Sequence, residues 1–143
     1  MNEKTRARSN PAATEGLRSD ADALMTIAIM AASAKGGMEM RKLTRLQALA
    51  RHSPEFRHLQ DVSTYVCIMV GKTARDNKTA ALQRSVATLS SSLRKKAYAW
   101  ARAMTSDSET ESEDEGEFLN VLRRRLKIPH QEEVHRLSGE IHG

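Results

Sequence analysis

The spacing of residues 23–34 predicts a helix, and nearly every face of that helix is apolar. Leu24, Ile27, Ala28 and Ala31 share one side of that helix, and further apolar residues surround them. A helix that is apolar all round is stable in water only when other elements cover it. The run therefore predicts the central helix of a core built from other helices.

The rest of the chain repeats the helical spacing in shorter, amphipathic stretches, and no segment shows the alternation of a strand. Aromatic residues make up only 3% of the chain, which favours closely packed helices over a sheet. The predicted fold is all-α: a helical bundle of six to seven helices with an internal pseudo-duplication. The expected helices cover about residues 20–34, 38–52, 59–71, 77–89, 93–104 and 113–126, with a short last helix around 134–141.

The chain of 143 residues is long enough for one domain with its own core. Residues 1–19 contain Arg, Ser, Asn, Pro and Gly and hardly any apolar side chains, so they predict a flexible basic arm. Residues 20–143 are expected to form the helical domain. Ser53-Pro54-Glu55-Phe56 predicts a turn inside it, because the residue before a proline avoids helical backbone angles.

Charge is distributed unevenly along the sequence. Seven of the 18 acidic residues fall between Asp107 and Glu117, so the remaining chain carries 23 basic against 11 acidic side chains, a formal charge of +12 where the whole carries +5. Like charges packed this closely repel one another unless they are solvated, face a basic surface or share a cation. This acidic segment is where we expect function to lie.

Three interpretations of the acidic segment follow from its residues: a weak site for a divalent cation such as Ca²⁺, a solvated cap that binds a basic partner, or an inert solvated face. Carboxylates are the ligands that hard cations prefer. A calcium-binding loop of the hand-shaped type is excluded, because Ser112 and Phe118 stand where Gly and Glu are required. The candidate metal ligands are Asp107, Glu109, Glu111, Glu113, Asp114 and Glu115.

Two basic clusters, Arg94-Lys95-Lys96 and Arg123-Arg124-Arg125 with Lys127, could contact phosphates. The few aromatic residues predict no stacking platform, and no recognition-helix signature accompanies them. Nonspecific, weak nucleic-acid binding is therefore the alternative function. The five histidines lack the spacing of a zinc site, and no nucleophile, base and orienting group can be assembled, so we expect no enzyme activity.

A single cysteine, Cys67, lies in the apolar run of residues 66–70 and predicts a buried thiol. Without a disulfide framework, the cytoplasm is the expected location. Glu15, Asp20 and Asp22 precede the first apolar run, where a secretion signal needs positive charge. That run is also too short to span a membrane, so no transmembrane segment is expected.

Two parts of the chain share one plan: an alanine-rich apolar helix, a small polar loop and a charged helix with a leucine stripe. Residues 27–37 lead into Leu43, Leu46 and Leu49, and residues 98–107 lead into Phe118, Leu119, Leu122 and Leu126. Two helical hairpins bridged by the middle helices would give a pseudo-symmetric bundle.

On these features the chain resembles the TerB-like family of tellurite-resistance domains. The resemblance covers roughly residues 22–129. The segments that carry it are Ala31-Ala32-Ser33-Ala34-Lys35-Gly36, Ser53-Pro54-Glu55-Phe56, Ser106-Asp107-Ser108, Glu113-Asp114-Glu115 and Leu126-Lys127-Ile128-Pro129.

In that family each loop between paired helices usually has Asp-Gly followed by Glu, which is taken as a divalent-cation site. The second loop here places Asp107 at the aspartate, Ser108 at the glycine and residues 113–115 at the downstream acids. The first loop places Lys35 at the aspartate and Met40 and Arg41 at the acids. Half of the family's cation ligands are therefore absent.

The resemblance implies a non-enzymatic module in stress or tellurite-type resistance that acts through protein contacts, with weak divalent-cation binding at the acidic segment as the one cofactor. It further implies association with a peripheral membrane complex. A protein partner is expected first, and nucleic acid second.

Overall fold

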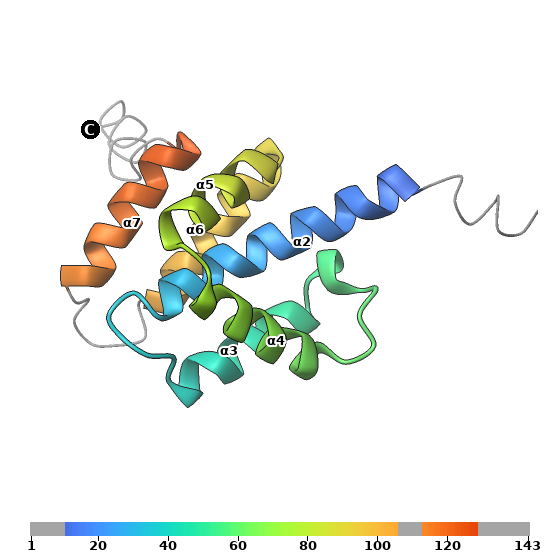
Figure 1. The fold of residues 1–143 in the computed structure, drawn as a ribbon, viewed down its shortest axis with the longest axis horizontal. Helices are drawn as coiled ribbons and strands as arrows, with labels where there is room; N and C mark the ends of the chain where they lie inside the picture. The colour runs from blue at the N-terminus through green and yellow to red at the C-terminus, as the bar shows by residue number, and fades with distance from the viewer. Residues whose placement is uncertain (1–10, 106–112, 129–143) are drawn as a thin grey trace, which may run out of the picture.

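The computed structural model describes residues 11–105 and 113–128, and every regular element among them is a helix (Figure 1). The predicted all-α helical bundle is confirmed. Its elements are α2 (Pro11–Ala32), α3 (Met40–Arg51), the short 3₁₀ helix η1 (Pro54–Phe56), α4 (Val62–Arg75), α5 (Lys78–Thr88), α6 (Ser91–Thr105) and α7 (Glu113–Leu126).

Helix α2 runs through the middle of the bundle, with α5, α6 and α7 on one side and α3 and α4 on the other (Figure 1). Its most extensive packing is against α6, α5 and α4. Every residue from Ala23 to Ala32 except Thr26 is buried. The prediction of a central helix, drawn from its apolar surface on all faces, is confirmed.

Capping side chains set where two of the amphipathic helices begin. The Asp61 carboxylate accepts a hydrogen bond from the Thr64 backbone N–H (3.1 Å) at the start of α4. The Asn77 side chain accepts one from the Ala80 N–H (2.8 Å) at the start of α5. Each cap satisfies a backbone donor that the first turn of a helix leaves without a partner. The sequence predicted that α5 begins at Asp76 or Asn77.

The end of α7 is a Schellman turn. Lys127 has a φ of 59°, and the Ile128 N–H donates to the Arg123 carbonyl (3.1 Å) while the Lys127 N–H donates to the Arg124 carbonyl (3.1 Å). This pair of hydrogen bonds satisfies carbonyls at the helix end and reverses the chain before Pro129. Helix α7 therefore ends where the sequence predicted.

One offset relates the two hairpins. Helices α2 and α6 end 73 positions apart, at Ala32 and Thr105, and α3 and α7 begin 73 positions apart, at Met40 and Glu113. The buried leucines Leu46 and Leu119 follow the same offset. The ends of the first helices, the starts of the second helices and these two leucines therefore follow one sequence offset, which agrees with the predicted pseudo-duplication.

Two predictions need correction. Residues 11–19 were predicted as part of the flexible arm, but they form the first turns of α2, which starts at Pro11. Proline suits the first helical position, because its missing N–H would have no partner there. Cys67 was predicted to be buried and is exposed, as is Ile68 (62%), because the core side of α4 is formed by Val66, Met69 and Thr73.

The remaining residues of the predicted arm, 1–10, and the expected helix at 134–141 lie outside the described residues. Among the helices that are described, none combines the length and the apolar character that a membrane crossing needs.

Candidate functional site

The two hairpins meet at a buried ion pair. The Lys42 ammonium of α3 donates to the Glu115 carboxylate of α7 at 3.0 Å, and the two side chains are 1% and 0% exposed. Lys42 and Glu115 are themselves 73 positions apart, so they occupy equivalent places in the two halves. The duplication thus places opposite charges opposite one another at the junction of its halves.

Lys42 also binds the end of the central helix. Its ammonium donates to the carbonyl of Ala32, the last residue of α2, at 3.3 Å. Carbonyls in the last turn of a helix lack helical partners and carry partial negative charge, so an ammonium there is favourable. Arg45, one turn further along α3, donates in the same way to the Ala103 carbonyl near the end of α6 (2.9 Å). Side chains of α3 therefore donate hydrogen bonds to the last turn of α2 and to the last turn of α6.

The structure separates the predicted metal ligands into three groups. Asp107, Glu109 and Glu111 lie outside the described residues. Glu115 is buried against Lys42, so that ammonium already neutralises its charge. Glu113 and Asp114 are exposed in the first turn of α7, and neither forms an ion pair with a described residue.

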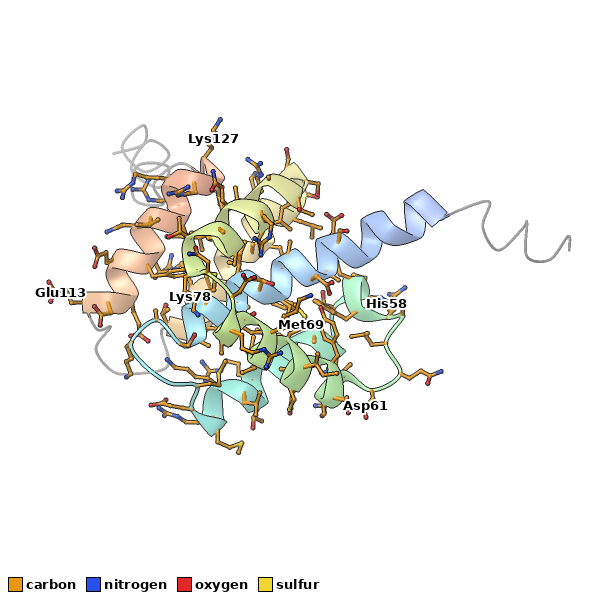
Figure 2. The ribbon with its side chains drawn as sticks, viewed as in Figure 1. His58, Asp61, Met69, Lys78, Glu113 and Lys127 are labelled. Atoms are coloured by element: carbon orange, nitrogen blue, oxygen red, sulfur yellow. The ribbon has the colours of Figure 1, made fainter. Side chains whose placement is uncertain are left out.

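Figure 2 shows Glu113 projecting outward at the start of α7, at the opposite end of that helix from Lys127. Glu117, one turn into α7, is exposed as well. We refer to Glu113, Asp114 and Glu117 as the acidic corner. The corner is fixed in place by the Glu115 side chain, which projects from the same helical turns into the interior. Within the ranges 11–105 and 113–128, no three His, Cys, Asp or Glu side chains are grouped closely enough to hold a metal ion.

The first predicted basic cluster is largely occupied by internal contacts. Arg94 donates to the carbonyls of Val86 (3.1 Å) and Leu89 (3.3 Å) at the end of α5. Lys96 donates to Glu55 at 2.6 Å. Only Lys95 of this cluster is exposed and forms no described ion pair. Arg94 and Lys96 therefore stabilise the fold and leave little of this cluster for phosphate.

The second basic cluster is more accessible. Arg124, Arg125 and Lys127 are exposed at the end of α7, and none of them has an ion-pair partner among the described residues. We refer to these three as the basic end of α7. Acidic residues at the start and basic residues at the end of one helix both complement its dipole. Helix α7 therefore presents two oppositely charged surfaces, one at each end.

Sequence reasoning missed a polar cluster beside Trp100. Glu55 of η1 accepts hydrogen bonds from Ser53 and from Lys96, and the Lys96 ammonium lies 5.7 Å from the Trp100 ring centroid. Burial raises the pKa of Glu55, but the hydrogen bonds from Lys96 and Ser53 and the Lys96 charge outweigh that effect, so its pKa falls below the ordinary value. This cluster joins η1 to α6 and is structural.

Comparison with known proteins identifies no relative. No protein-family model matches the chain, and neither a curated protein nor a solved structure matches it.

Proposed function

We propose that the chain is a non-enzymatic, TerB-like helical module of the cytoplasm that acts in stress or tellurite-type resistance. It acts by contact with a protein partner through the acidic corner and the acidic residues that precede it. A divalent cation such as Ca²⁺ binds weakly at the same place. Asp107, Glu109, Glu111, Glu113 and Asp114 supply the ligands, and Glu115 anchors the helix that carries the last two.

One observation carries this proposal. The duplicated hairpins neutralise one acid internally, through Lys42 and Glu115, and leave the neighbouring acids Glu113, Asp114 and Glu117 exposed without a basic partner among the described residues. The helix already orders the backbone that carries these carboxylates, so little backbone entropy is lost when a basic partner binds. Charge complementarity of this kind raises the association rate and selects basic partners.

Helix α7 also supports a second candidate, nonspecific nucleic-acid binding, through the basic end. Arg124, Arg125 and Lys127 are exposed and without described ion-pair partners. The acidic corner on the same helix would repel phosphates, and Arg94 and Lys96 are already committed to internal contacts. The protein-contact function is therefore the better supported of the two.

Two variants with equal changes of charge separate the candidates. The first carries Glu113→Gln, Asp114→Asn and Glu117→Gln. The second carries Arg124→Gln, Arg125→Gln and Lys127→Gln. Each neutralises three exposed side chains on α7, so neither should disturb the core, and each serves as the control for the other.

Affinity capture from cell extract and DNA-binding titrations are then run on both variants. Under the proposed function, the acid-neutralised variant loses a captured partner that the basic-end variant retains. Under the second candidate, the basic-end variant loses DNA affinity, and its slope of log affinity against log salt falls by about 2.7 if all three side chains contact phosphates. Capture of the same proteins by both variants would refute the role of the acidic corner.

A further inference from the structure

A polar pocket of about 240 Å³ lies between α2, α4 and α5, away from the acidic corner. Its apolar lining comes from Ala23, Met69 and Ala81, all of which are buried. Figure 2 labels Met69 on α4, beside the central helix. Lys72, Arg84 and Thr88 also line the pocket and are exposed, so it is accessible from solvent. Its volume lies below the roughly 300–1,000 Å³ of pockets for drug-sized ligands, so it suits a smaller molecule.

Two hydroxyl groups that line this pocket have no hydrogen-bond partner among the residues that the structure describes. Thr73 of α4 is 4% exposed and Ser85 of α5 is 7% exposed, and both line the pocket. Neither side chain makes a hydrogen bond to any group in the part of the chain that the structure describes. Buried polar groups are nearly always satisfied, so water or a ligand in the pocket must supply a partner for these hydroxyls.

The charged groups of the pocket are matched only in part. Arg84 and Asp76 pair with each other at 2.6 Å. The Lys72 ammonium forms no ion pair within residues 11–105 and 113–128, but its charge acts on Asp76. The pKa of Asp76 is lowered by the backbone hydrogen bond from Asn77, by Arg84 and also by the Lys72 charge. Asp22 accepts a hydrogen bond from the Tyr65 hydroxyl on one carboxylate oxygen at 2.6 Å, and its other oxygen makes no hydrogen bond to a described group.

The Tyr65 hydroxyl donates its hydrogen bond to the Asp22 carboxylate from a partly buried position. Burial raises the pKa of Tyr65, and the hydrogen bond to Asp22 and the negative charge of that carboxylate raise it further. Tyr65 therefore fixes the orientation of the Asp22 carboxylate in the wall of the pocket. The pocket thus presents a cation that forms no ion pair with a described residue, Lys72, and an oriented carboxylate, Asp22, with one oxygen that no described group binds.

We propose that this pocket binds a small zwitterion, a free α-amino acid with a short aliphatic side chain. The ligand carboxylate binds the Lys72 ammonium, and the ligand ammonium binds the free oxygen of Asp22. The Thr73 and Ser85 hydroxyls supply the remaining hydrogen bonds. The aliphatic side chain packs against the apolar lining. The site shares no residue with the acidic corner, so it stands or fails independently of the proposed function.

The test is an NMR titration of the full chain with glycine, alanine and valine. Butyrate and butylamine each carry only one of the two charges, and inorganic phosphate tests simple anion binding. We expect saturable shifts of the amide signals of Asp22, Lys72, Thr73 and Ser85 with the amino acids, and at least tenfold weaker binding of each single-charge compound. No saturable shift with any amino acid would overturn the proposal and leave a water-filled pocket. Equal or tighter binding of butyrate or phosphate would replace it with a plain anion site.

Variants test the contacts separately. Lys72→Gln should weaken amino-acid binding at least tenfold, whereas Lys95→Gln, at an exposed lysine of α6, should leave it unchanged. Thr73→Val keeps the side-chain shape and removes an unsatisfied hydroxyl, so the thermal midpoint should stay level or rise while affinity falls. Equal affinities of the Lys72 and Lys95 variants, or unchanged affinity in the Thr73 variant, would contradict the assigned contacts.

Discussion

Loss of either member of the buried Lys42–Glu115 pair should be among the most destabilising single changes in this protein. Lys42→Met leaves the Glu115 carboxylate in an interior where it is 0% exposed, and Glu115→Gln leaves the Lys42 ammonium 1% exposed without its counter-charge. Removing one partner of a buried pair costs about 3–5 kcal/mol, because the other charge remains desolvated. For a chain of this size, 1 kcal/mol corresponds to about 3 °C in the midpoint, so each variant should melt roughly 10–15 °C below the wild type.

The double variant Lys42→Met with Glu115→Leu separates the cost of breaking the pair from the net value of the intact pair. Replacing both partners by apolar side chains removes the desolvation penalty, so we expect it to recover most of the stability lost by either single variant. It should not exceed the wild type by much, since the Ala32 carbonyl loses its 3.3 Å hydrogen bond from Lys42.

The measurement is urea and thermal unfolding followed by circular dichroism, with Glu39→Gln as the matched control. Glu39 pairs with Arg41 at 3.2 Å on the surface, with side-chain exposures of 43% and 61%, so breaking that pair should cost less than about 1 kcal/mol. If Lys42→Met and Glu39→Gln proved equally stable, the pair would not be buried in solution and the junction of the hairpins would need another explanation.

Three further changes have defined outcomes. Asn77→Ala removes the acceptor of the Ala80 N–H at the start of α5 and should cost about 1 kcal/mol in urea unfolding; no change would mean that this cap is not formed. Lys127→Gly relieves the backbone strain of a left-handed residue (φ 59°). That strain of about 1–2 kcal/mol exceeds the entropy cost of glycine, about 0.5–1 kcal/mol, so the thermal midpoint should rise slightly. A fall in the midpoint would refute the left-handed turn. Glu55 has a lowered folded-state pKa, so its ionised form stabilises the fold above about pH 4.5 and that contribution is lost as pH falls through the folded value. The stability gap between wild type and Glu55→Gln should therefore narrow on acidification below pH 4.5, and a constant gap would contradict the Lys96 contact.

Much of the fold could be predicted because it follows from local patterns. The apolar run of α2 required a central position, Asn77 and Pro54 set local starts and turns, and the leucine stripes of α3 and α7 identified the paired hairpins. The predicted start of α2, at about residue 20, was wrong. Residues 11–19 have few apolar side chains, and such a composition favours disorder. Tertiary packing on the rest of α2 extends the helix beyond the point that composition supports.

The prediction that Cys67 is buried was wrong for a different reason. Consecutive residues of a helix point in different directions around its axis, and only one side of the helix faces the core. Some residues of an apolar run must therefore point outward. Val66 and Met69 lie on the side of α4 that faces the core of the bundle, whereas Cys67 and Ile68 are exposed. A run of apolar letters cannot by itself distinguish these sides.

The buried pair at the centre of the site was missed because charged residues ordinarily predict an exposed surface. The signal was present in the duplication. Matching Met40 and Arg41 with the first two acids of α7 places Lys42 on Glu115, one residue further along the same alignment. Opposite charges at equivalent positions of two halves that face one another predict contact, and that inference needs the register of the repeat rather than composition.

We propose that the exposed acids at the start of α7 form the interacting surface of this protein. Residue-resolved NMR tests it most directly, by titration of the full chain first with Ca²⁺ and then with a lysine-rich peptide. We predict weak, saturable shifts in both titrations at the amides of Glu113, Asp114 and Glu117, with loss of both in the variant that neutralises these three side chains. Absence of any shift at these amides in both titrations, or equal shifts in the variant that neutralises the three side chains, would contradict this role of the acids.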